Sequence, residues 1–139
     1  MTTIPLPNFL PADALDDFEK FDGPLIYLAA PLEHPDRSVR QIRFESVNRY
    51  CGYLIRQHAL VFSPLSFGAS LDEDAIPNSA WYALGLQMLS SCDDLRILEL
   101  YGWQDSVGVT LETRYVRQLH IPVSVADPST YEVKLLHGN

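Results

Sequence analysis

Leu25-Ile26-Tyr27-Leu28-Ala29-Ala30 is the stretch that decides the fold, an unbroken apolar run that ends at Pro31. A run this short, closed by proline, is typical of a strand that is buried on both faces of a sheet. After a loop, residues 36–57 carry apolar side chains at helical spacing and arginines on the opposite side. A buried strand followed by an amphipathic helix indicates a parallel sheet, because parallel strands need a crossover connection.

The same alternation continues along the rest of the chain. Residues 63–78, rich in Pro, Gly and Ser and in acidic residues, are typical of a long loop, and residues 131–136 are too short to assign. Strands that alternate with helices are joined by right-handed crossovers. We therefore expect an α/β fold, a three-layer, flavodoxin-like parallel sheet with helices on both faces. The further strands are expected at 59–62, 95–100 and 123–126, and the further helices at 79–91 and 106–119.

The length of 139 residues fits one domain with a single well-formed core. Residues 1–23 form a distinct segment, rich in proline at its start and acidic afterwards, with a short helix expected after Pro11. We interpret 1–23 as an acidic N-terminal extension and 24–139 as the main domain.

The sequence contains 10 Lys and Arg and 18 Asp and Glu, which gives a net charge of −8. This negative charge argues against a nucleic-acid partner. The sequence has neither an apolar stretch of the roughly 20 residues that a membrane span needs nor a signal-peptide pattern, so we expect a cytoplasmic protein. Cys51 and Cys92 are expected as reduced thiols. Because metal-ligand spacings and glycine-rich nucleotide motifs are absent from the sequence, we expect neither a metal nor a cofactor.

A small anionic ligand remains compatible with this charge, because the N-terminus of a helix can hold one phosphate. Ligands of parallel sheets bind at the carboxyl ends of the strands, and Ser106-Val107-Gly108 begins a helix at that edge. Serine is a favoured N-cap, and glycine allows a close approach to the backbone. The pattern fits an anion site, although a serine cap followed by glycine is more often an ordinary helix start.

Glu112 lies between Val109 and Val116 on one stripe of that helix. A carboxylate inside an apolar stripe indicates either a functional group or a boundary glutamate paired with an arginine such as Arg96 or Arg40. The pattern alone leaves both interpretations open.

Ser106-x-Gly108-Val109-x-x-Glu112 is similar to the signature of nucleoside 2-deoxyribosyltransferases and the related deoxynucleoside 5′-monophosphate N-glycosidases. The resemblance runs from about residue 25 to 125 and includes several phrases in the expected order. These phrases are Ile26-Tyr27-Leu28-Ala29-Ala30-Pro31, His34-Pro35-Asp36, Val61-Phe62-Ser63-Pro64, Cys92-Asp93 and Gly102-Trp103. The chain most closely resembles an uncharacterised subgroup of that superfamily.

The resemblance implies an enzyme that hydrolyses or transfers at the N-glycosidic bond of a small nucleoside or nucleoside 5′-monophosphate. Glu112 would be the nucleophile, Tyr27 would orient it or the sugar, and Glu99 would lie near the site, unless Glu99 is a solvated strand-end charge. A homo-oligomer is also implied. The expected substrate-binding residues are Ala30, His34, Trp103, Ser106 and Gly108.

One departure favours an alternative, a non-catalytic nucleotide-binding or interaction module. Relatives carry an aspartate on the helix before the third strand, where this chain has Gly85. Acidic residues 72–74 of the preceding loop (Asp72, Glu73, Asp74) are potential substitutes. We expect Trp81 and Tyr82 to pack in the core. The arginines of residues 36–57 are expected on a solvated helix face: Arg37, Arg40, Arg43, Arg49 and Arg56.

Overall fold

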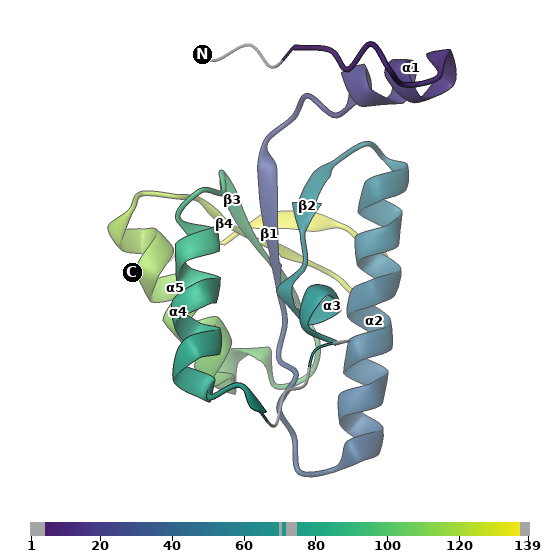
Figure 1. The fold of residues 1–139 in the computed structure, drawn as a ribbon. Coiled ribbons are helices and arrows are strands. Elements are labelled where there is room, and N and C mark those ends of the chain that lie inside the picture. The colour runs from purple at the N-terminus through teal and green to yellow at the C-terminus, as the bar shows by residue number, and fades with distance from the viewer. Residues whose placement is uncertain (1–4, 70, 72–74, 137–139) are drawn as a thin grey trace.

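The computed structural model describes residues 5–69, 71 and 75–136 (Figure 1). Along the chain, the helices and strands alternate as the sequence predicts. Their bounds are α1 (Ala12–Lys20), β1 (Leu25–Ala29), α2 (Arg37–Arg56), β2 (Leu60–Phe62), α3 (Pro64–Gly68), α4 (Asn78–Leu89), β3 (Asp94–Leu98), the 3-10 helix η2 (Trp103–Asp105), α5 (Val107–Gln118), β4 (Val123–Ala126) and β5 (Val133–Leu135).

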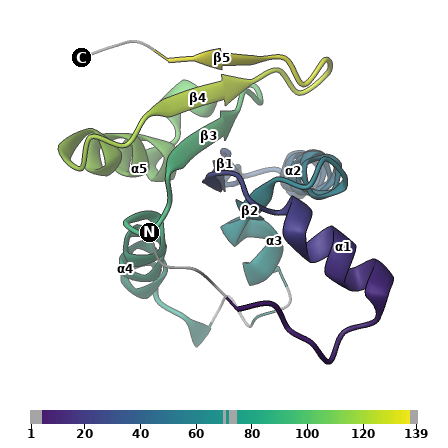
Figure 2. The same ribbon diagram turned by 90° about the horizontal axis from the view of Figure 1, so that it is seen from above.

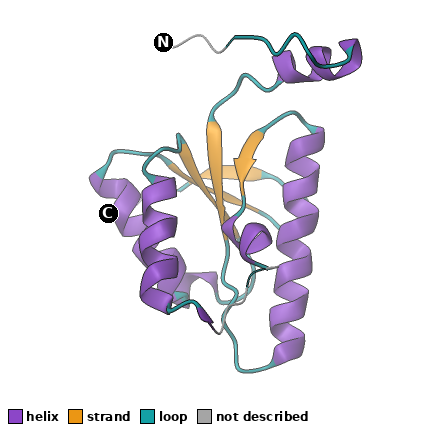
Figure 3. Ribbon diagram, viewed as in Figure 1, coloured by secondary structure: helices purple, strands orange, loops and turns teal. Residues whose placement is uncertain are grey.

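The strands form one sheet in the order β2-β1-β3-β4-β5 (Figure 3). The first four are parallel, and Tyr27 of β1 is in register with Phe62 of β2 and Leu95 of β3. This order is that of flavodoxin-like sheets, so the predicted fold class is confirmed. The order in which strands are added reverses between β1 and β3. The crossovers on either side of this point lie on opposite faces of the sheet.

Helices cover both faces of the sheet, α2 on one and α4 with α5 on the other (Figure 2). Alternate residues of β1 supply the two core clusters, because successive side chains of a strand point to opposite faces. Tyr27 and Ala29 pack on the side of α4 and α5, whereas Leu28 packs with Val47 and Tyr50 of α2.

Besides the 3-10 helix η2, a short helix and a short strand were not predicted. Helix α3 lies inside the segment expected to be a loop, and it begins with Pro64 after Ser63, a favourable start for a helix. Strand β5 pairs antiparallel with β4 at the edge of the sheet, and all its residues are exposed. Both elements are too short to produce a periodic pattern.

Helix α1 has no buried residue and lies apart from the sheet layers (Figure 1). The segment contacts the domain through His58, whose ring packs edge-on against Phe21 at 5.2 Å between centroids. The His58 Nε2 also lies 3.4 Å from a carboxylate oxygen of Asp17. In the part of the chain that the structure describes, none of the helices has the length and apolar character needed to cross a membrane.

Candidate active site

A cavity of about 1000 Å³ opens at the carboxyl ends of the parallel strands. Its inner end is the sheet edge, and its sides are the N-terminal half of α2 and the facing surfaces of α4 and α5. Figure 1 shows why this space exists, since α2 extends well past the carboxyl ends of β1 and β2. The helix therefore forms a wall beyond the region where it covers the sheet.

Tyr27 and Glu112 meet at the inner end of this cavity. Tyr27 is almost completely buried on β1, and its hydroxyl donates a hydrogen bond to the carboxylate of Glu112 on α5. Burial raises the pKa of Glu112 from 4.5 to about 7, against the lowering effect of this hydrogen bond. Burial also raises the pKa of Tyr27 well above its usual range, and the nearby Glu112 charge adds to the effect, so the phenol keeps its proton.

Among the described residues, Glu112 forms no ion pair with an arginine. Arg96 donates to Asp94 and to Ser124 on the opposite face of the sheet, at 3.2 and 3.1 Å. Arg40 donates to the carbonyl oxygens of His34 and Pro35. Within residues 5–69, 71 and 75–136, no basic group lies within 4.0 Å of the Glu112 carboxylate. The interpretation of Glu112 as an ion-paired boundary residue is therefore wrong.

The N-terminus of α5 forms another part of the cavity wall. Ser106 is its N-cap, and the Ser106 Oγ accepts from the Val109 amide at 3.3 Å. In the described chain, the amides of Val107 and Gly108 have no protein acceptor. The space beside Gly108 is open, because a Cβ there would meet only the Ser106 Oγ, at 4.0 Å. Two free amides at the positive end of a helix suit a negatively charged group.

Six of the eight residues predicted for the site line the cavity: Tyr27, Ala30, His34, Ser106, Gly108 and Glu112. His34 is exposed, and its Nδ1 accepts from the Asp36 amide at 3.0 Å. The structure does not bring Glu99 to the cavity. Its amide donates to Ala126 of β4, on the side of β3 away from β1.

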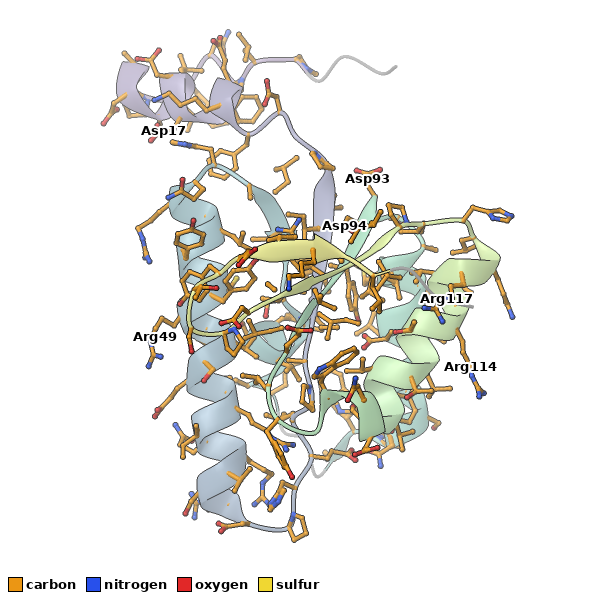
Figure 4. The ribbon with its side chains drawn as sticks, turned by 180° about the vertical axis from the view of Figure 1, so that it is seen from behind. Asp17, Arg49, Asp93, Asp94, Arg114 and Arg117 are labelled. Carbon is orange, nitrogen blue, oxygen red and sulfur yellow. The ribbon has the colours of Figure 1, made fainter. Side chains whose placement is uncertain are left out.

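Trp103 is also kept away from the cavity. It packs against the core cluster under α5 and lines a separate pocket of about 250 Å³. Arg114 and Arg117 line the same small pocket, and Figure 4 shows both on α5. Trp103 precedes α5 on η2 and lines this small pocket, whereas Glu112 of α5 lines the large cavity.

A family model described as "Domain of unknown function (DUF1937)" matches residues 24–127. The chain belongs to this nucleoside 2-deoxyribosyltransferase-like family. The superfamily resemblance predicted from the sequence is thereby confirmed. No curated protein shows significant similarity to this DUF1937 chain.

Among solved structures, the DUF1937 chain is similar to a 2-deoxyribosyltransferase from the psychrotolerant bacterium Bacillus psychrosaccharolyticus. The two share 19% identity and superpose with a TM-score of 0.57, over 79% of this chain and 77% of that chain. At this level of identity, the likeness shows a shared fold.

Gly85, the departure from the superfamily pattern, lies directly opposite the Tyr27 hydroxyl in this DUF1937 domain. A Cβ at Gly85 would lie 3.0 Å from the Tyr27 Oη, so a larger residue on α4 requires the phenol ring to move. The potential acidic substitutes, residues 72–74, lie outside the described part of the chain. Glycine therefore gives Tyr27 the room in which it reaches Glu112.

Four predictions about other residues of the DUF1937 chain are wrong. Trp81 and Tyr82 are half-buried and line the cavity instead of filling the core. The reason is that this part of α4 lies beyond the carboxyl edge of the sheet. Arg40 and Arg43, expected on a solvated face, also line the cavity, and each guanidinium donates to two loop carbonyls. Their position on the protruding half of α2 explains the difference. Only the topology, and no local sequence signal, distinguishes them from the other arginines of the helix.

Proposed function

We propose that the protein is an N-glycosidase or deoxyribosyltransferase-like enzyme that acts on a nucleoside 5′-monophosphate or nucleoside. The observation that carries this proposal is the buried Tyr27–Glu112 pair at the inner end of the cavity. A carboxylate held by one neutral donor, with no cation beside it in the described chain, retains its nucleophilicity.

The reaction has two steps. A Glu112 oxygen attacks C1′ of the sugar, the C1′–N bond breaks, and the base leaves with the bonding electrons and takes a proton from water. Positive charge develops on C1′ in the transition state, as in glycoside hydrolysis, and the nearby carboxylate stabilises it. In the second step, water or a second base attacks C1′, the ester bond breaks, and Glu112 is regenerated as the attacking group loses a proton.

Tyr27 keeps Glu112 oriented and partly ionised. With a pKa of about 7, roughly half of Glu112 is ionised at neutral pH. Ser106 and the free amides of Val107 and Gly108 support a role in binding the 5′ side, where a phosphate suits two free N–H donors. Ala30 and His34 line the same cavity and are proposed to contact the substrate.

The test is to incubate the purified protein with ribo- and deoxynucleosides and their 5′-monophosphates and to measure free base by chromatography. Base release should disappear in Glu112→Gln, which keeps the side-chain shape. The matched control is Glu132→Gln, an exposed carboxyl beside β5, which should retain the wild-type rate. Full activity in Glu112→Gln would refute the nucleophile assignment.

A second candidate is a nucleotide-binding module without turnover. Gly85 favours it, because this position offers no carboxylate to hold the sugar. Calorimetry that detects nucleotide binding, without base release even when a second base is offered, would favour this candidate.

We also infer a homo-oligomer. Several apolar side chains at the cavity rim are exposed, among them Ile42 at 63%, Val107 at 61%, Phe67 at 48%, Leu84 at 46% and Met88 at 40%. Clustered exposed apolar side chains are typical of interaction surfaces. Light scattering should give a mass above 15.7 kDa, and a monomeric mass at working concentration contradicts the inference.

A further inference from the structure

Arg43 joins two loops that belong to different crossovers. Its Nη1 donates to the carbonyl oxygen of Glu33, in the loop after β1, at 3.0 Å. Its Nη2 donates to the carbonyl oxygen of Tyr101, in the loop after β3, at 2.9 Å. These loops leave the sheet on either side of the point where the strand order reverses.

The two bonds require a guanidinium. Its planar, rigid fork presents separate N–H donors to two acceptors at once, which a lysine ammonium on a flexible stem does not reproduce. In the described ranges, no carboxylate lies within 4.0 Å of Arg43. Both of the bonds that hold it therefore go to the backbone.

Gly102 completes the arrangement on the second loop. Its φ of 85° lies in the left-handed region that favours glycine. A Cβ at Gly102 would lie 3.3 Å from the Arg43 Nη2, so a side chain there would crowd the guanidinium. Glycine at position 102 therefore allows both the left-handed turn and the close approach of the Arg43 guanidinium.

Each tied loop leads to a residue of the proposed site. The first loop carries Ala30 and His34, and the second continues through η2 to Ser106, the N-cap of α5. Helix α5 in turn carries Glu112. Arg43 therefore connects the segment that follows β1 with the segment that leads into α5.

We propose that Arg43 is a positioning residue of the site: it fixes the loop after β3, and with it the N-terminus of α5, against the loop after β1. The catalytic part of this proposal rests on the proposed function, whereas the coupling of the loops does not. Arg43 acts through the two backbone carbonyls and need not touch the substrate.

Arg40 is the matched control, because it lies one turn earlier on the same helix and is also half-buried. It donates to the carbonyls of His34 and Pro35, both in the loop directly before its own helix. Loss of Arg40 therefore disturbs the first loop alone, and loss of Arg43 disturbs both.

The first experiment is amide hydrogen exchange on the full chain by NMR, comparing the wild type with Arg43→Ala and Arg40→Ala. The reporters are Trp103, Asp105 and Ser106, whose amides bond to carbonyls within the second loop. We expect about tenfold faster exchange of these amides in Arg43→Ala and wild-type exchange in Arg40→Ala. Unchanged exchange of the reporters in Arg43→Ala overturns the proposal, whether or not the protein has the proposed activity.

The second experiment uses the base-release assay. Misplaced groups slow the chemical step, so Arg43→Ala should lower kcat by at least about tenfold, and KM should rise as well because the displaced segment carries Ser106 and Gly108. Guanidinium added at millimolar concentration should restore part of kcat. A rise in KM with unchanged kcat would overturn the positioning role. If Arg43→Ala does not fold, Arg43→Lys should show the same faster exchange to a smaller extent, and wild-type behaviour of Arg43→Lys overturns the proposal.

Discussion

The Tyr27 hydroxyl donates to the Glu112 carboxylate, joining the first strand of the domain to the last helix. This hydrogen bond stabilises the charged form of Glu112 and lowers its pKa, whereas burial raises it. The pKa of about 7 results from these opposing effects.

If Glu112 is the nucleophile, activity should depend on its ionisation. Only the carboxylate attacks C1′, so kcat/KM should rise with pH through an apparent pKa of about 7 and then level off. A pH–rate profile of base release measures this directly. A profile that is flat between pH 5 and 8 would contradict the assignment.

Tyr27→Phe should move that profile to higher pH. The substitution removes the donor that favours the charged carboxylate, so the pKa of Glu112 rises above about 7. The rate at neutral pH should fall by a factor of several, and part of it should return at higher pH. An unshifted profile would mean that the hydroxyl has no effect on the ionisation of Glu112.

Glu112→Gln should stabilise the fold at alkaline pH. The folded-state pKa lies above the value of 4.5 for the free group, so the folded protein binds more protons between these values. The wild type therefore loses stability as pH rises from about 4.5 to 7, and above pH 7 the loss amounts to about 3 kcal/mol at most. Urea denaturation at pH 5 and 8 should show a smaller difference between the two pH values in the variant. Equal pH dependence in both proteins would count against this burial of charge.

Two glycine-to-alanine substitutions in helices should have opposite effects. In Gly85→Ala the new methyl meets the Tyr27 Oη at 3.0 Å, and the ring is buried, so we expect a loss of about 1–3 kcal/mol and of activity. In Gly52→Ala the methyl meets only the mobile end of Arg56, at 3.3 Å, so higher helix propensity should stabilise by up to about 1 kcal/mol. Thermal unfolding of both variants measures the difference, and equal effects would contradict the close packing at Gly85.

Arg96→Met should destabilise the protein by about 3–5 kcal/mol, because it leaves Asp94 without its cation in a nearly buried position. Asp94 also accepts from the Ser124 Oγ at 3.0 Å, and Figure 4 shows its place on the sheet. Adding Asp94→Asn to this variant should recover much of the loss, because the uncompensated charge is gone. Denaturation curves of the single and double variants test this, and additive losses would contradict it.

The sequence predicts the layers because each principal element leaves a clear pattern. Helical spacing places Glu112 on the inner stripe of α5. The run 25–30 is apolar throughout, so no alternation in the sequence assigns Tyr27 to either face of the sheet. The pairing of Tyr27 with Glu112 is therefore predicted only through the superfamily resemblance.

Residues beyond the sheet edge are harder to predict. Arg43 and Trp81 occupy helix positions whose surroundings depend on how far each helix protrudes, a quantity that periodicity does not contain. Trp103 follows a turn at Gly102, so its direction depends on a single backbone conformation. The strand pattern places Glu99 at the carboxyl edge of the sheet, but it does not indicate which neighbouring strand the Glu99 backbone pairs with.

Because α2 extends past the sheet, its two halves are subject to different constraints. Val47, Tyr50 and Leu54 in its C-terminal half are buried in the core, where substitutions affect the stability of the fold. Val39, Ile42 and Ser46 in its N-terminal half line the cavity. If the cavity binds the substrate as proposed, substitutions in this half change which ligand fits and leave the core of the domain unchanged.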